Sequence, residues 1–127
     1  MIFGIGTDIV SVARIEAAVQ QHGAAFAQKI LTPSELADYA LAPHPARFLA
    51  KRFAAKEAFA KATGQGLRHP ITLHNLTVNH DAMGKPQFCF AAELSVQLQQ
   101  LGIRHHHLSI SDEKDHAIAF VILEVAS

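Results

Sequence analysis

The stretch from Pro45 to Thr63 constrains the fold most, because it predicts one long helix in a chain of only 127 residues. The stretch is rich in Ala, Leu, Lys and Arg, which favour helices. Pro45 stands at a helix start, where its missing backbone N–H is harmless, and Gly64 follows as a typical helix end. We therefore expect the other elements of this small domain to pack against the helix.

The other elements predicted from the sequence are shorter and include several strands. Residues 2–9 form an apolar run that predicts a short buried strand, and apolar spacing over 11–22 predicts a helix that Gly23 ends. Thr32-Pro33-Ser34-Glu35 predicts a helix start with a capping box. Further strands are predicted over 73–78, 87–90, 107–111 and 117–125, and a short helix over 93–101. This order is α+β, without a regular βαβ alternation.

Composition is that of a folded protein with one domain. Hydrophobic residues make up 50% of the chain, yet no apolar run approaches the ~18 residues of a membrane span. The first residues lack a basic leader, so we expect no signal peptide. A single cysteine, Cys89, excludes an internal disulfide, and eleven basic residues balance eleven acidic ones. We expect one domain, residues 1–127, in the cytoplasm, with no nucleic-acid or membrane partner.

Two carboxylates carry the chemical prediction. Asp8 lies near the end of the first predicted strand, and Glu57 lies in the long helix, one turn before Lys61. A carboxylate from a strand and one from a helix commonly hold a hard divalent cation, whose other positions are filled by water and phosphate oxygens. The pair therefore predicts magnesium-assisted phosphoryl chemistry.

Structural explanations of the same residues remain open at this stage. Asp8 can simply cap the turn that follows it, and Glu57 with Lys61 can be an ordinary helix ion pair. Arg52 and Lys56 fall on a neighbouring stripe, where charges usually indicate a solvated helix face. The nearby phenylalanines predict that the helix is packed. This packing argues against the explanation that its charged residues only form a solvated surface.

Other polar groups are weaker candidates. The run His105-His106-His107 does not predict a metal site, because consecutive residues on a strand point to opposite faces, and we expect only His107 to be functional. Cys89 is predicted in a sheet or core position between two phenylalanines. Gly84-Lys85-Pro86 predicts a turn whose lysine can also reach a phosphate.

Three motifs together resemble those of a known family. Ile5-Gly6-Thr7-Asp8, the segment from Arg52 to Ala58 and Gly84-Lys85-Pro86 resemble, in order and spacing, the signature of the 4′-phosphopantetheinyl transferases. The short single-domain length is similar to that of the bacterial holo-[acyl-carrier-protein] synthase branch. The resemblance implies the fold of that family, a mostly antiparallel sheet packed against a long helix.

The resemblance also implies a reaction and the residues that perform it. Such enzymes transfer the 4′-phosphopantetheine arm of coenzyme A to a serine of apo-acyl carrier protein, in support of fatty acid biosynthesis, and release adenosine 3′,5′-bisphosphate. Asp8, Glu57 and Lys61 would be catalytic, with Mg²⁺ held by Asp8 and Glu57. The implied coenzyme A contacts are Arg52, Lys56, Lys61, Gly64, Gly66, Lys85 and His107. The general base stays open between a water on the metal and Glu57 acting through water.

Partners follow from the same resemblance. Arg14 matches a position that docks the acidic carrier protein, and members of this branch are typically homotrimers with sites shared between subunits. Two other classes of protein remain as alternatives. A metal-dependent hydrolase of nucleotides or pyrophosphates could use the same carboxylates, and a non-catalytic oligomeric binding module would need neither of them.

Overall fold

The computed structural model describes all residues from Met1 to Ser127 and confirms an α+β domain. The elements and bounds, in chain order, are β1 (Ile2–Ser11), α1 (Val12–His22), α2 (Ala24–Ile30), α3 (Pro33–Ala40), α4 (Pro45–Thr63), β2 (Leu76–His80), β3 (Pro86–Phe90), α5 (Ala92–Gln100), β4 (Ile103–Asp112) and β5 (His116–Val125). No helix has both the length and the apolar character needed to cross a membrane.

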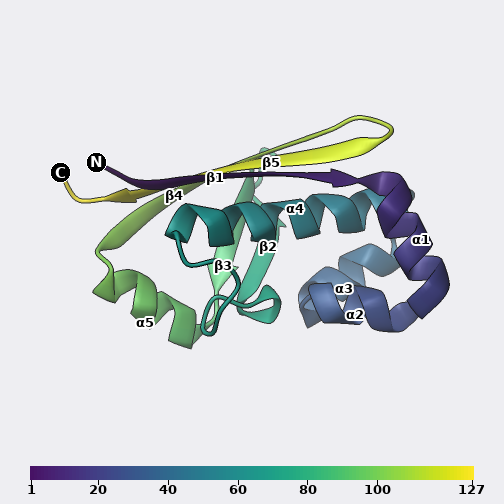
Figure 1. The fold of residues 1–127 in the computed structure, drawn as a ribbon, viewed down its shortest axis with the longest axis horizontal. Coiled ribbons are helices and arrows are strands. Elements are labelled where there is room, and N and C mark those ends of the chain that lie inside the picture. Colours follow the sequence, from purple (N-terminus) through teal and green to yellow (C-terminus); the bar gives the residue numbers. More distant parts are fainter.

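The strands form two antiparallel sheets. One has the order β1-β5-β4, and the other is the β2-β3 hairpin. The long helix α4 lies along the three-stranded sheet, while α1 to α3 gather at one end of it and α5 lies at the other (Figure 1). The predicted packing of a long helix against an antiparallel sheet is therefore confirmed.

Small residues let β1 and α4 lie very close together. Ala58 and Ala62 are at most 3% exposed on the sheet side of α4. A Cβ atom at Gly6 would lie 1.9 Å from the Ala58 carbonyl oxygen, and one at Gly4 would lie 1.9 Å from the Ala62 carbonyl oxygen. Only glycine permits this approach of two backbones. The glycines of the first motif therefore bring the strand that carries Asp8 directly onto the helix that carries Glu57.

The first strand is buried on one face only, which corrects the prediction of a buried strand. The residues of β5 that face α4, such as Ala119, are fully buried, whereas Phe120 is 43% exposed. On β1, Ile5 and Ile9 are 53% and 62% exposed. The reason is that α4 covers one side of the sheet and no element of the chain covers the other. We call this uncovered side the outer sheet face.

The structure differs from the prediction at two local segments, and the other predicted helices and strands are present. Helix α2 was not predicted, and Leu73–Asn75 is a 3₁₀ turn instead of the start of a strand. In that turn the Thr72 hydroxyl accepts a hydrogen bond from the Asn75 backbone N–H, a local bond that competes with strand pairing. The capping box of α3 and the bounds of α4 are confirmed.

Candidate active site

A hollow beside α1 brings together residues that the sequence separates by about fifty positions. It has a volume of about 460 Å³. Its lining comes from β1, α1, α2 and α4 and consists of Asp8, Ile9, Val10, Ser11, Arg14, Ile15, Phe26, Phe53 and Glu57. The two predicted metal ligands and the predicted docking arginine therefore share one cavity.

Asp8 is held in place by Lys61. The register of β1 places Asp8 opposite the buried Ala119, so its side chain points to the side of the sheet that α4 covers. The Lys61 ammonium donates to the Asp8 carboxylate over 2.9 Å and to the Thr7 carbonyl over 3.0 Å. Asp8 does not cap the following helix, because the Ser11 hydroxyl does so by accepting from the Arg14 backbone N–H.

Glu57 has no hydrogen bond or ion pair of its own. Its neighbour Lys61 pairs with Asp8 instead, so the explanation of Glu57 and Lys61 as an ordinary helix pair was wrong. Burial raises the pKa of the Glu57 carboxyl, and the negative charge of Asp8 raises this pKa further, against a smaller opposing effect of Lys61. A half-buried carboxylate without a partner beside a second carboxylate is an arrangement that a cation would stabilise.

The donor set suits a magnesium ion that keeps most of its shell from outside the protein. No group of three or more His, Cys, Asp or Glu side chains gathers anywhere in the chain, so Asp8 and Glu57 have no third ligand of these types beside them. Mg²⁺ is usually bound by one or two carboxylates together with waters and substrate phosphates, and it prefers hard oxygen ligands. Two carboxylates fit such an ion, whereas they do not fit a closed structural metal site.

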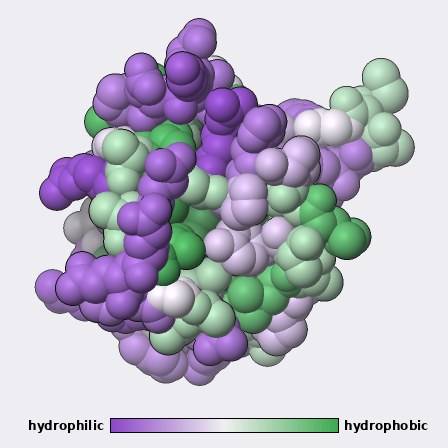
Figure 2. Space-filling view, turned by 90° about the vertical axis from the view of Figure 1, so that its right-hand side faces the viewer, coloured by the Kyte–Doolittle hydropathy of each residue, from purple (hydrophilic) through white to green (hydrophobic).

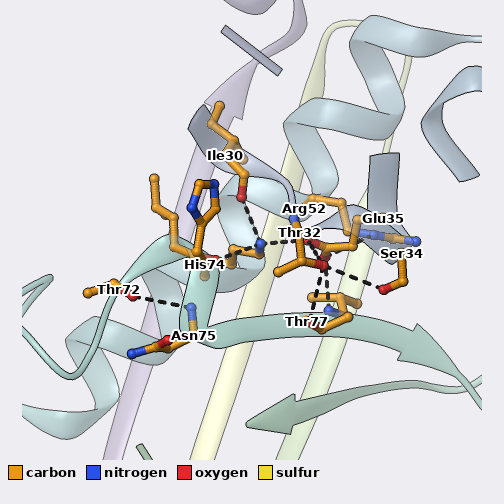
Figure 3. Close-up of polar contacts among 12 residues, drawn as sticks. Ile30, Thr32, Ser34, Glu35, Arg52, Thr72, His74, Asn75 and Thr77 are labelled. Carbon is orange, nitrogen blue, oxygen red and sulfur yellow. Dashed lines mark hydrogen bonds and ion pairs between the residues drawn. The ribbon is translucent and has the colours of Figure 1, made fainter. Parts of the chain in front are cut away.

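Arg52 and Lys56 are buried, which corrects their interpretation as a solvated helix face. They are 4% and 0% exposed. The Lys56 ammonium donates to the Ile30 carbonyl oxygen, to the Glu35 carboxylate and to the Leu73 carbonyl oxygen, over 2.8, 2.6 and 2.8 Å (Figure 3). All three of its donors are thus used inside the protein. We therefore assign Lys56 no contact with coenzyme A.

Arg52 has a similar internal role. Its guanidinium lies 4.3 Å from the centre of the Phe48 ring, and its Nε atom lies 3.6 Å from the Glu35 carboxylate. Sequence reasoning identified Glu35 only as a capping residue and missed that its carboxylate binds two cations from α4. The capping box itself gave no signal of this second role.

The other predicted contacts lie outside the hollow. Gly64 and Gly66 follow the end of α4 with left-handed backbone angles, and Lys85 is exposed in the turn between β2 and β3. His107 pairs in register with Ile122, so it lies on the outer sheet face and points away from Asp8. As predicted, its neighbour His106 points the other way, where its ring accepts from the Phe88 backbone N–H over 3.1 Å.

A larger hollow, of about 820 Å³, lies on the opposite side of α1. It is bounded by the segment between α3 and α4 and by the turn between β4 and β5, and it contains none of the predicted site residues. Figure 2 looks onto this end of the molecule and shows hydrophobic patches framed by hydrophilic side chains. The candidate active site is the smaller hollow, because the two carboxylates that suit phosphoryl chemistry converge there with Arg14.

The fold is that of a known family. Residues 4–121 match the model of the 4′-phosphopantetheinyl transferase superfamily, and the chain belongs to this family. It is 55% identical to the holo-[acyl-carrier-protein] synthase of Nitrosospira multiformis, over 98% of this chain and 99% of that protein.

Solved structures agree with this assignment. The crystal structure of the holo-[acyl-carrier-protein] synthase of Neisseria meningitidis superimposes with a TM-score of 0.95 at 52% identity, over 98% of this chain and 99% of the other. That of Bacillus anthracis, in complex with coenzyme A (3′,5′-ADP), has a TM-score of 0.83 at 34% identity and covers 99% of each chain.

Proposed function

We propose that this protein is a magnesium-dependent holo-[acyl-carrier-protein] synthase that transfers 4′-phosphopantetheine from coenzyme A to a serine of apo-acyl carrier protein. The observation that carries the proposal is the convergence of Asp8 and Glu57 in one hollow, with Lys61 bonded to Asp8. This occurs in a chain that is 55% identical, over nearly its whole length, to a protein with that activity in its name. The product would supply acyl carriers for fatty acid biosynthesis in the cytoplasm.

Asp8 and Glu57 would hold the magnesium ion. When bound, Mg²⁺ neutralises charge on the pyrophosphate and polarises its oxygens. Glu57 supports this role because its carboxylate has no partner within the chain, and Asp8 keeps one oxygen outside its bond to Lys61. The negative charge of Asp8 adds to the effect of burial in raising the pKa of Glu57. A cation bound by both carboxylates would reduce this repulsion.

In the proposed reaction, the serine oxygen of the carrier protein forms a bond to the β-phosphorus of coenzyme A. The bond from that phosphorus to the bridging oxygen breaks, and adenosine 3′,5′-bisphosphate leaves with the bond's electron pair. The Lys61 ammonium, which is 54% exposed at its side chain, can contact the pyrophosphate while it orients Asp8. The serine proton goes to solvent through a base, and Glu57 acting through a water is one candidate in the hollow.

Arg14 would receive the carrier protein. It is exposed on α1 and lines the same hollow as the two carboxylates, so an acidic protein bound there would present its serine to the phosphates. Electrostatic complementarity of this kind mainly governs encounter and specificity. Gly64, Gly66, Lys85 and His107 remain proposed contacts for coenzyme A, of which the glycines offer close backbone approach.

Association of several copies would complete the site. The outer sheet face exposes Ile5, Ile9, Ile118 and Phe120, which supports self-association because large apolar residues gathered on one face usually mark an interface. His107 lies on that same face, away from Asp8, so its proposed contact with coenzyme A would be made at the site of a neighbouring copy. The trimeric number rests on the family resemblance.

The proposed activity is tested by the mass of an apo-acyl carrier protein after incubation with this protein, coenzyme A and Mg²⁺. We expect a gain of one phosphopantetheine, and no gain when EDTA is present. Coenzyme A hydrolysed without any gain by the carrier would instead favour the hydrolase alternative. A light-scattering mass in solution tests the trimer separately, and a monomer that still transfers would exclude a shared site.

A further inference from the structure

The buried polar cluster around Glu35 and Lys56 connects the active-site helix to three other parts of the chain. Lys56 on α4 donates to the end of α2 at Ile30, to Glu35 on α3 and to the 3₁₀ turn at Leu73. Figure 3 shows the Ile30 and Glu35 acceptors close together in this cluster. Three acceptors from three segments fix the position of this group in all directions.

Glu35 extends the cluster to a fourth segment. One carboxylate oxygen accepts from the Thr32 backbone N–H over 2.9 Å, and the other accepts from the Val78 backbone N–H on β2 over 2.9 Å. The carboxylate is also bonded to Lys56 and lies near Arg52. Glu35 is 0% exposed, so its charge is removed from water and depends entirely on these partners.

A cluster of this kind is not needed for stability alone. Removing two charges from water costs several kcal/mol per ion, and well-packed apolar residues of similar volume are often as stabilising. A buried ion pair also fixes the relative orientation of the segments that carry it, because its hydrogen bonds are satisfied in only one arrangement.

The orientation that Lys56 fixes includes that of Glu57. Residues 56 and 57 are adjacent on α4, so a helix that is fixed at Lys56 is also fixed at Glu57. The interface of α4 with β1 is built from Ala58, Ala62, Gly4 and Gly6. These small residues set how closely the two elements approach, and the fully buried Phe59 packs α4 against Phe88 and Phe90. The cluster adds directional hydrogen bonds at Lys56, the residue next to Glu57, which apolar packing does not provide.

We infer that Glu35 and Lys56 are positioning residues, which hold α4 in the rotation and register that place the Glu57 carboxylate beside Asp8. The inference rests on the proposed function, since Glu57 is the group that is positioned. Neither residue touches substrate or metal. Supporting groups one step behind the metal ligands typically change metal affinity or activity by 10- to 100-fold when they are replaced.

The test replaces the charge pair by neutral side chains of similar shape, in the variant Glu35→Gln/Lys56→Met. It removes both charges of the pair but leaves Arg52, which stays stacked on Phe48, beside an amide in place of the carboxylate. We therefore expect a chain that folds with lower stability than the wild type. Binding of Mn²⁺ to the full-length protein is followed by electron paramagnetic resonance at saturating coenzyme A. We expect a dissociation constant about tenfold higher than in the wild type and a lower kcat, with KM for the carrier protein unchanged.

A matched control separates positioning from a loss of stability. Leu94→Ala removes a fully buried side chain from α5, away from the carboxylates, and should lower the melting temperature without changing Mn²⁺ affinity. If the paired variant folds and binds Mn²⁺ within twofold of the wild type, the inference is overturned. A wild type that neither binds Mn²⁺ nor transfers would instead refute the proposed function.

If the paired variant does not fold, Glu35→Gln alone serves as the test. The glutamine amide oxygen can still accept from the Thr32 N–H and from Lys56, but its NH₂ group cannot accept from the Val78 N–H. We expect Mn²⁺ affinity to fall by about threefold, less than in the paired variant because Lys56 stays in place. Unchanged affinity in a folded Glu35→Gln protein would overturn the inference in the same way.

Discussion

Lys56 and Lys61 stand five positions apart on one helix and have opposite surroundings. The Lys56 side chain is 0% exposed and donates to three fixed acceptors, whereas the Lys61 side chain is 54% exposed and orients Asp8 at the edge of the hollow. Helix α4 thus carries a buried polar stripe that is bonded to other segments of the chain and an exposed stripe beside Asp8. The residues of α4 between Lys56 and Lys61 therefore combine a structural role with a proposed chemical role.

The largest effect is expected at the two carboxylates of the hollow. Asp8→Ala and Glu57→Ala should each lower transfer at saturating Mg²⁺ by at least about a hundredfold, because the proposed cation would lose one of its two protein ligands. Both variants should remain folded by circular dichroism, since neither carboxylate holds a core element in place. Glu113→Ala, in an exposed turn, is the matched control and should leave transfer unchanged. Full activity in Asp8→Ala or Glu57→Ala would contradict the two-carboxylate site.

The same Lys→Met substitution, made separately at Lys56 and at Lys61, tests whether the two lysines have different roles. Lys56→Met leaves the Glu35 carboxylate buried with only Arg52 as a cation, and we expect the free energy of unfolding to fall by about 3 kcal/mol. Lys61→Met should change it by less than about 1 kcal/mol, because its ion pair is partly exposed.

The rate of transfer per folded molecule should fall more in Lys61→Met than in Lys56→Met. Lys61→Met should lower kcat by about tenfold or more, since it removes a cation from the phosphates. Urea unfolding and steady-state kinetics on both variants check the pair of expectations. Equal losses of stability in Lys56→Met and Lys61→Met would show that the two environments do not differ as described.

A smaller effect is expected where the carrier protein docks. Arg14→Glu should raise KM for apo-acyl carrier protein by about tenfold, because an acidic partner would meet a like charge. KM for coenzyme A should not change, since Arg14 is assigned to the protein partner. Steady-state kinetics with each substrate varied in turn measures both values. Loss of coenzyme A affinity instead would move Arg14 to the nucleotide site.

The smallest effect concerns pH in the absence of metal. Burial raises the pKa of Glu57 in the folded protein, so the folded state binds this proton more tightly than the unfolded state does. Stability should therefore fall as pH rises from the ordinary glutamate pKa through the raised one. Glu57→Gln should remove this loss and should melt slightly higher than the wild type near neutral pH without metal. Mg²⁺ should stabilise the wild type more than this variant, and identical melting curves at every pH would exclude the effect.

Much of the local structure could be predicted because its causes are local. Pro45 and Gly64 delimit α4, and the Thr32–Glu35 capping box starts α3, through interactions within a few residues. The 3₁₀ turn after Thr72 was missed because one side-chain hydrogen bond there outweighs a weak strand pattern. Asp8 and Glu57 could be named as a pair because a strand carboxylate and a helix carboxylate commonly hold a cation and because the family signature contains both. The sequence does not show that they share a hollow.

The sequence by itself determined most of the order of the elements, with α2 and the 3₁₀ turn missed, together with the limits of the long helix and the residue types available for chemistry. Only the tertiary structure decided which lysine is buried, which partner Lys61 takes and which way His107 points. Adjacent helix positions differ by a rotation of about 100°, and their residues look alike in a sequence until a partner is known. For Lys56 that partner is Glu35, 21 positions earlier, and for Lys61 it is Asp8, 53 positions earlier. Such distances along the chain are closed only when β1, α3 and α4 pack together.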